Sequence, residues 1–276
     1  MKPFVKWVGG KRKLLKYLLP LFPEYIEGTY YEPFLGSGAM FFALKERQPD
    51  LKAVLSDANL DLMVAYQQVR DNPDELIQWL CLYEQKHKKD PYTCYDDVRS
   101  QDRFGYDKFA DVCKAARLIY LNHTCFNGLW RVNCKGFMNV PMGKYVNPTI
   151  CDREAIMECH RALQGVTILC QDYHKIRPIT DDWLYCDPPY CEKYAGYHQG
   201  GFGHTDTSLL AWNCYKWREK GVHILVSNSD VVHVRNSWGN IFGKPWEFQT
   251  VQRSGTINSD ATKRQKVQEL IIYDRT

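Results

Sequence analysis

The sequence lacks the long apolar segments that mark membrane and exported proteins. No stretch approaches the run of about 18 apolar residues that a membrane helix needs. Residues 1–19 are interrupted by lysines and an arginine, so they lack the apolar centre of a secretory signal. We therefore expect a cytoplasmic protein without a membrane partner.

Closely spaced cysteines are also missing, although the chain contains eleven cysteines. The nearest pair, Cys186 and Cys191, is five positions apart, and no histidine pair at zinc-ligand spacing lies beside it. An odd number of cysteines in a long chain without an export signal favours reduced, buried thiols over a disulfide scaffold. We expect no metal site.

Positive charge is concentrated in two regions, although the net charge of +4 is small. The first twenty residues contain six Lys and Arg and no acid, and residues 85–148 contain eleven basic and six acidic residues. Aromatic residues are interleaved in the second region. Cationic and planar side chains together suit a polyanion whose bases can be stacked, so nucleic acid is a candidate partner. A solvated surface is the alternative for this region taken alone.

Short apolar runs alternate with helical patterns, which predicts an α/β fold with a mainly parallel sheet. The predicted helices include Ala39–Arg47, about Leu60–Arg70, Asp152–Gln164 and Asp206–Glu219. The predicted strands are Thr29–Phe34, Ala53–Ser56, Val166–Cys170, Trp183–Cys186 and His223–Ser227, followed by an antiparallel pair near Glu247–Gln252 and Val267–Tyr273.

The alternation lapses in the middle of the chain. Helical patterns cover Pro73–Lys89 and about Asp107–Asn122, and a hairpin with strands Trp130–Val132 and Phe137–Val140 follows. We therefore expect residues 58–150 to form an inserted, mainly helical module that carries a β-hairpin. Residues 1–57 and 151–276 would form the main α/β domain.

A glycine loop follows the first predicted strand. Gly36 and Gly38 precede a helix, where glycines let the backbone approach a ligand and the helix amino terminus offers N–H groups. Asp57 lies nineteen residues after Gly38, at the end of the next strand, where an acid can bind ribose hydroxyls. The three-glycine spacing of NAD sites is absent. The pattern favours a nucleotide-type cofactor other than NAD, with an ordinary tight turn as the alternative.

The most specific string is Asp187-Pro188-Pro189-Tyr190, directly after an apolar run. Two prolines fix the backbone and keep the Pro188 carbonyl out of a helix or a strand ladder. Asp187 adds a carboxylate and Tyr190 adds a ring face at the carboxyl edge of the sheet, where ligands bind in open α/β folds. A rigid turn with a surface aspartate is the alternative for the tetrapeptide alone.

Seven motifs along nearly the whole chain resemble those of the Dam-type DNA adenine-N6 methyltransferases, in that family's order. They are Phe4-x-Lys6-Trp7-x-Gly9-Gly10-Lys11, Glu32-Pro33-Phe34-x-Gly36-x-Gly38, Ser56-Asp57-x-Asn59, Asn127-Gly128-Leu129-x-Arg131-x-Asn133, Asn139-Val140-Pro141-x-Gly143-x-Tyr145, Asp187-Pro188-Pro189-Tyr190 and Ser227-Asn228. The resemblance implies a Rossmann-like methyltransferase with a mixed sheet. It also implies an S-adenosyl-L-methionine (SAM)-binding catalytic domain over 1–57 and 151–276, and a DNA target-recognition module over 58–150.

The resemblance implies a cofactor site residue by residue. Trp7 and Lys11 resemble contacts near the methionine end of SAM, where a lysine ammonium would pair with the cofactor carboxylate. Asp57 resembles the ribose-binding acid, and Asp172 resembles the residue near the cofactor adenine. The full predicted cofactor set is Trp7, Lys11, Phe34, Gly36, Gly38, Asp57, Asp172 and Asp187.

The resemblance places the reading of double-stranded DNA mainly in the inserted module. Phe126 would fill the gap left by a flipped base, Arg131 would contact a guanine edge, and Lys6 resembles a contact to the first guanine of the target. These matches imply GATC as the preferred site. Lys263, Arg264 and Lys266 are candidate phosphate contacts, with no binding role as the alternative. A plain turn at Asn127-Gly128 and a phosphate contact by Arg131 are the alternatives for the inserted module. The predicted DNA-binding set is Lys6, Phe126, Asn127, Leu129, Arg131, Pro141 and Tyr145.

The predicted catalytic residues are Asp187, Pro188 and Tyr190. The Asp187 carboxylate and the Pro188 carbonyl would accept the two N–H groups of an exocyclic amine and aim its lone pair at the methyl donor. Tyr190 would stack on the extruded base. The expected reaction is methyl transfer to adenine N6 in duplex DNA. Cytosine-N4 methylation, RNA adenine methylation and a catalytically silent DNA-binding homologue are the alternatives.

Overall fold

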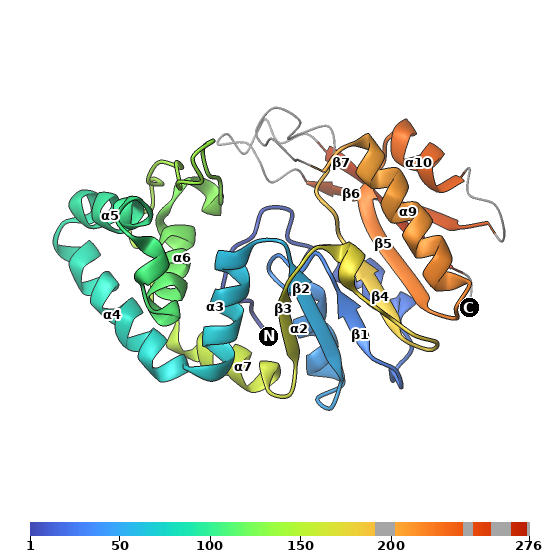
Figure 1. Cartoon of the computed structure of the whole chain (residues 1–276), viewed down its shortest axis with the longest axis horizontal. Coiled ribbons are helices and arrows are strands. Elements are labelled where there is room, and N and C mark those ends of the chain that lie inside the picture. The colour runs from blue at the N-terminus through green and yellow to red at the C-terminus, as the bar shows by residue number, and fades with distance from the viewer. Residues whose placement is uncertain (191–201, 240–244, 255–265, 275–276) are drawn as a thin grey trace. The chain divides into compact units, whose positions relative to one another are not determined.

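The computed structural model describes residues 1–190, 202–239, 245–254 and 266–274 (Figure 1). The candidate phosphate contacts Lys263 and Arg264 therefore lie outside the described residues. The chain forms two compact units. Unit 1 consists of Met1–Arg12, Gly36–Pro49 and Asp57–Gln171, and unit 2 consists of Lys13–Leu35, Asp50–Ser56 and Asp172–Thr276.

Seven strands form one mixed sheet in the order β3-β2-β1-β4-β5-β7-β6. Strand β1 pairs in parallel with β2 and β4, and β4 pairs in parallel with β5, whereas β5 and β6 each pair antiparallel with β7. The sheet confirms the predicted Rossmann-like α/β fold and the antiparallel final pair. The strands are β1 Tyr30–Glu32, β2 Ala53–Asp57, β3 Thr167–Cys170, β4 Trp183–Cys186, β5 His223–Ser229, β6 Glu247–Ser254 and β7 Lys266–Tyr273.

Unit 2 has its core along the middle of the sheet. All four residues of β4 are buried, as expected for an apolar strand between two parallel neighbours. The helices α9 (His204–Arg218) and α10 (Val232–Gly239) pack against each other beside β5 (Figure 1). Cys186 pairs with Val226 in the parallel register. Asp187, directly after β4, therefore lies beside Ser227, which is still part of β5.

Unit 1 is built around helix α6, which spans Asp111–Thr124. Every residue from Ala115 to Thr124 is buried, because α3, α4 and α5 all pack against this helix (Figure 1). A helix surrounded in this way must satisfy its polar side chains inside the protein. The other helices of the unit are α2 Ala39–Arg47, α3 Leu60–Asp71, α4 Pro73–Lys89, α5 Pro91–Ser100 and α7 Arg153–Leu163.

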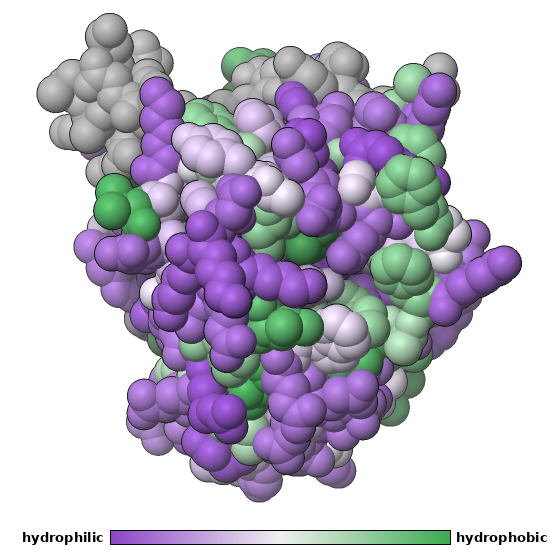
Figure 2. All heavy atoms as spheres, turned by 90° about the vertical axis from the view of Figure 1, so that its left-hand side faces the viewer, coloured by the Kyte–Doolittle hydropathy of each residue, from purple (hydrophilic) through white to green (hydrophobic). Residues whose placement is uncertain are grey.

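The outer helices of unit 1 are amphipathic. Helix α4 buries Leu76, Ile77, Leu80 and Tyr83, which recur at helical spacing, and presents charged side chains on its other side. Figure 2 looks toward this side of the molecule and shows a surface on which hydrophilic side chains predominate. The alternation of apolar and polar residues therefore explains why α4 lies at the surface of the unit.

Local signals fix several helix ends at the predicted residues. Helices Ala39–Arg47 and Pro73–Lys89 have the predicted bounds. The Asn59 side chain accepts a hydrogen bond from Leu62 N at 3.0 Å and begins α3, and Asp152 does the same for α7 through Ala155 N at 3.2 Å. Among the described residues, helices α5 and α10 were not predicted. The first helix of the chain, α1, is short and spans Leu15–Leu18.

The predicted β-hairpin is present as a turn, and its two predicted strands are not. One bridge joins Val132 to Met138, supported by a hydrogen bond from Asn139 N to Arg131 O at 3.1 Å. The prediction of strands Trp130–Val132 and Phe137–Val140 was therefore wrong. The ladder does not continue, because Phe137 N donates to the Asn133 side chain at 3.1 Å and not to the Asn133 carbonyl. The Met138 N–H lies on the side away from the bridge and donates to the Asp102 carboxylate at 2.7 Å.

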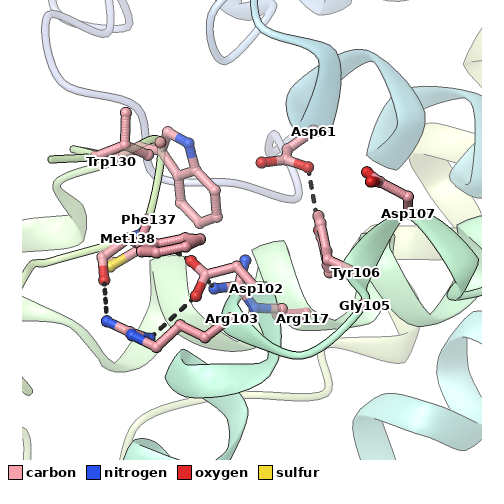
Figure 3. A pocket seen from close by; sticks show the side chains of 12 residues that line it. Asp61, Asp102, Arg103, Gly105, Tyr106, Asp107, Arg117, Trp130, Phe137 and Met138 are labelled. Atoms are coloured by element: carbon pink, nitrogen blue, oxygen red, sulfur yellow. Dashed lines mark hydrogen bonds and ion pairs between the residues drawn. The ribbon is translucent and has the colours of Figure 1, made fainter. Parts of the chain in front are cut away.

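Asp102 attaches this turn to the helices of unit 1. Its carboxylate accepts hydrogen bonds from Met138 N at 2.7 Å, from Arg117 Nη2 at 2.7 Å and from Arg103 Nη1 at 3.0 Å. Arg117 is 1% exposed and also donates to two backbone carbonyls of α5. Figure 3 shows these groups beside a hollow of about 350 Å³ with Trp130 and Tyr106 on its walls. A buried ion pair thus determines where the turn lies.

Substitution of Asp102 by alanine should destabilise unit 1 strongly. The change removes the charge partner of the buried Arg117 and the acceptor of Met138 N, and loss of one partner of a buried ion pair costs about 3 kcal/mol or more. Asp96→Ala is the matched control, because Asp96 is 69% exposed in its pair with Arg99. The control should change the free energy of unfolding by less than about 1 kcal/mol. Urea denaturation measures both, and equal losses would contradict this account.

Candidate active site

Asp187 follows β4 directly and is oriented by the neighbouring strand β5. Ser227 Oγ donates a hydrogen bond to Asp187 Oδ1 at 3.1 Å. The Tyr185 hydroxyl lies 2.8 Å from Ser227 Oγ, and because serine has a single O–H, Tyr185 must be the donor in that bond. Burial, and next the charge of Asp187, raise the pKa of Tyr185 and keep it protonated. Two side chains, one from each of two parallel strands, thus hold one carboxylate in place.

Two prolines restrict the backbone of the rest of the tetrapeptide. Pro188 is buried, Pro189 is exposed and Tyr190 is half-buried. The Tyr190 hydroxyl donates a hydrogen bond to the carboxylate of Glu269, a fully buried residue of β7. The sequence reasoning missed Ser227 as an orienting group and missed Glu269 altogether. A lone acid within the apolar stretch of a predicted strand was the available signal for Glu269.

The carboxyl end of β1 carries further groups of unit 2. Glu32 is 2% exposed and accepts a hydrogen bond from the Tyr30 hydroxyl at 2.7 Å, while burial and this carboxylate raise the pKa of Tyr30. Phe34 is half-buried, and its ring centroid lies 5.2 Å from that of Tyr173. Asp172 precedes Tyr173 and is exposed. Of the predicted cofactor residues, Phe34, Asp172 and Asp187 belong to this unit.

The glycine loop and Asp57 come together in unit 1. Asp57 Oδ2 accepts a hydrogen bond from Gly36 N at 3.1 Å, and Oδ1 accepts one from Asn59 N at 3.0 Å. Burial raises the pKa of Asp57, while these backbone donors act in the opposite direction. Gly36 and Gly38 both adopt positive φ, at +49° and +64°. The loop conformation therefore requires glycine at both positions.

Trp7 lies against this loop, and Lys11 lies in the turn that follows Trp7. A Cβ atom at Gly36 would come within 2.9 Å of Trp7 Cδ1, so the indole can lie this close only to a glycine. Lys11 is 4% exposed, and its Nζ donates to Gly9 O at 3.0 Å. Trp7, Gly36 and Asp57 thus lie together. The segment that carries Trp7 also carries the buried ammonium of Lys11.

The predicted DNA-binding residues gather at the end of α6. Phe126 N donates to Pro141 O at 2.9 Å, which joins the two sides of the segment 125–145. The Lys6 ammonium lies 4.9 Å from the ring centroid of Tyr145, a cation–π distance. Phe126 and Tyr145 are each 39% exposed. Four of the predicted residues therefore form one surface with aromatic and cationic character.

The remaining predicted DNA-binding residues lie on the adjoining turn. Asn127 is exposed and adopts a positive φ of 55°, and Leu129 is half-buried. Arg131 Nε donates to Asn139 Oδ1 at 2.8 Å, so the side chain of Asn139 fixes the direction of the guanidinium. Burial lowers the pKa of Lys6, and nearby Lys2 lowers it further. The surface still presents cations from two separate segments of the chain.

Two kinds of feature are absent from the part of the chain that the structure describes. Among those residues, no three His, Cys, Asp or Glu side chains gather as a group that could hold a metal ion. No described helix is both long enough and apolar enough to span a membrane.

Comparison with known proteins identifies the family. The chain is 35% identical to the type II methyltransferase M1.LlaDCHI of Lactococcus lactis subsp. cremoris, over 99% of this chain and 95% of that protein. It is 34% identical to the type II methyltransferase M.MjaIII of Methanocaldococcus jannaschii, over 99% of each chain. It is 29% identical to the DNA adenine methylase of Escherichia coli K12, over 98% of this chain and 94% of that protein. Residues 7–251 match the family model of the D12 class N6 adenine-specific DNA methyltransferases, and the chain belongs to that family.

Proposed function

We propose that this DNA adenine methyltransferase transfers a methyl group from SAM to N6 of an adenine flipped out of duplex DNA, preferably in GATC. Membership of the family establishes methylation of DNA adenine at N6. The cofactor, the flipped base, the target sequence and the residue roles are what we propose in addition. The observation that carries it is the Asp187 carboxylate, held by Ser227 at the carboxyl ends of parallel strands. A DNA substrate would be met in the cytoplasm of a bacterial cell, by a bacterial or a phage-encoded enzyme.

The exocyclic amine of adenine is a poor nucleophile, because its lone pair is delocalised into the purine ring. Asp187 and the carbonyl of Pro188 would each accept one N–H, which favours a pyramidal nitrogen with a localised lone pair. Acceptors fixed in advance lower the barrier more than mobile ones, since no reorganisation is needed during the reaction. The bonds from Tyr185 through Ser227 to Asp187 supply that fixation.

Tyr190 would hold the extruded base by stacking. Extrusion costs a few kcal/mol of lost stacking and pairing, and an aromatic face recovers part of it. The hydrogen bond from the Tyr190 hydroxyl to the buried Glu269 limits the rotation of the ring. A restrained ring offers its face at a lower entropy cost than a mobile one.

Each unit contains residues whose chemistry suits one part of SAM. In unit 1, the buried ammonium of Lys11 suits a carboxylate, Trp7 lies beside the glycine loop, and Asp57 suits ribose hydroxyls. In unit 2, Phe34 and Asp172 would contact the adenine end. When bound, SAM supplies an electrophilic methyl group on a sulfonium. The chain's own contribution is to bind this group and orient the amine toward it.

DNA reading would fall to residues 58–150 together with Lys6, and the catalytic and SAM-binding work to residues 1–57 and 151–276. Phe126, Leu129 and Pro141 would fill the space left by the flipped base, with Asn127 and Tyr145 at its border. Arg131 would make two hydrogen bonds to a guanine edge, and Lys6 would contact the first guanine of GATC. The orientation of Arg131 by Asn139 supports this assignment.

Substitution of Asp187 by alanine should abolish methyl transfer and leave DNA binding largely unchanged. Loss of one preorganised group at a reacting centre costs at least about 100-fold in turnover. Asp50→Ala is the control, because Asp50 is an exposed acid of the same unit bonded to Tyr25. Methylation of plasmid DNA and duplex binding measure the two properties. Transfer retained in Asp187→Ala would refute the proposed mechanism.

Substitution of Arg131 by alanine should relax discrimination at one base pair of the target. Loss of a bidentate contact to guanine costs about 1–3 kcal/mol of discrimination. Lys135→Ala is the control, because Lys135 is exposed at the tip of the same turn. We expect it to leave the preferred sequence unchanged. Sequencing of exposed plasmid with detection of modified bases reports both, and an unchanged target in Arg131→Ala would contradict the assignment.

A further inference from the structure

Asn122 connects two segments that carry predicted DNA-binding residues. It lies in the last turn of α6 and is fully buried. Its Oδ1 accepts a hydrogen bond from Lys6 N at 2.7 Å, and its Nδ2 donates to Lys6 O at 2.6 Å. The same Nδ2 donates to Gly128 O at 3.1 Å. One side chain therefore contacts the backbone on both sides of Lys6 and the backbone of the turn 126–128.

The two segments also touch each other directly at Gly128. This glycine has a φ of +63°, and a Cβ atom on it would lie 3.1 Å from Lys6 Cβ and 3.2 Å from Lys6 O. Any larger residue would have to push the Lys6 segment away from the turn. We call Lys6, Asn122 and Gly128 the junction.

The chemistry of asparagine matches the junction in full. A primary amide offers one oxygen acceptor and two N–H donors, and the three backbone groups here are one donor and two acceptors. An aspartate of the same shape would face two carbonyl oxygens without a hydrogen to donate. Neighbouring His123 holds the same segment separately, with Nε2 3.0 Å from Phe4 O. With aspartate at position 122, the N-terminal segment would therefore stay attached through Phe4, while the position of Lys6 relative to α6 changed.

We propose that Asn122 is a positioning residue that fixes Lys6 relative to the turn 126–128. It thereby sets how strongly the enzyme discriminates its target sequence from other sequences. This inference rests on the proposed function, in which Lys6 and the turn read the same DNA site. Two cations on separate segments can contact neighbouring bases only if their spacing matches the duplex. Recognition groups must be held within about 0.5 Å for this purpose. The three hydrogen bonds of Asn122 provide that restraint.

The test compares Asn122→Asp and Gly128→Ala, which disturb the junction from the helix and from the turn, with Thr124→Val as the control. Thr124 is a buried residue two positions along α6 whose hydroxyl donates to Tyr120 O at 2.7 Å, within the helix. The measurement is the ratio of kcat/KM on a GATC duplex to kcat/KM on duplexes with one base pair changed. Thermal melting reports folding.

Both junction variants should lower this ratio about tenfold or more, mainly through KM on the GATC duplex, while Thr124→Val keeps it. In a Lys6→Ala background, Asn122→Asp should have little further effect, because the two residues act through one contact. Folded junction variants with an unchanged ratio would overturn the inference. So would additive effects with Lys6→Ala, or failure of both junction variants to fold.

Lys6→Ala alone separates this inference from the function on which it rests. If Lys6→Ala leaves the ratio unchanged, the proposed reading of DNA by Lys6 fails and the inference fails with it. If Lys6→Ala lowers the ratio and Asn122→Asp does not, the inference alone fails. Lowered ratios in both, with no additivity, support both statements.

Discussion

The hydrogen bond from Ser227 to Asp187 is the interaction on which the account of catalysis depends. It exists because β4 and β5 run parallel with Cys186 paired to Val226, so that Asp187, directly after β4, lies beside Ser227 of β5. A carboxylate on a flexible turn would lose the advantage of a fixed acceptor. The parallel sheet therefore does more than support the site, since its register sets the direction of the reacting group.

Unit 1 uses the same principle with buried polar groups on and around one helix. Asp102 and Arg117 determine where the turn 132–138 lies, and Asn122 fixes the backbone at Lys6 and Gly128. Buried polar groups of this kind are costly unless every partner is satisfied, and once satisfied they define one arrangement. The positions of the predicted DNA-binding residues would thus depend more on the buried side chains of α6 than on contacts among the exposed residues themselves.

Much of the fold could be predicted because the signals are local. The apolar run Trp183–Cys186 and the proline at the start of Pro73–Lys89 gave the exact bounds of β4 and α4. Helix α5 was missed because it buries only Cys94, Tyr95 and Val98 among polar residues. The N-cap residue of α5, Asp90, was available as a signal in the sequence. In the structure its Oδ1 accepts hydrogen bonds from Tyr92 N and Thr93 N.

The errors and omissions at the site involve partners that are distant in sequence. Asp102 accepts a hydrogen bond from the backbone N–H of Met138, 36 positions along the chain. Asn122 contacts Lys6 across 116 positions, and Ser227 contacts Asp187 across 40. No local pattern encodes such pairs. The motifs located the chemistry, whereas the groups that orient it emerged only from the folded chain.

The most direct test is a crystal structure with the SAM analogue sinefungin and a duplex that contains the target adenine. The account predicts that the extruded adenine N6 lies within hydrogen-bond distance, about 2.7–3.2 Å, of both the Asp187 carboxylate and the Pro188 carbonyl. The analogue should lie on the side of N6 toward which its lone pair points. An adenine amine bound by other groups, or side chains that fill the space beside Asp187, would contradict the account.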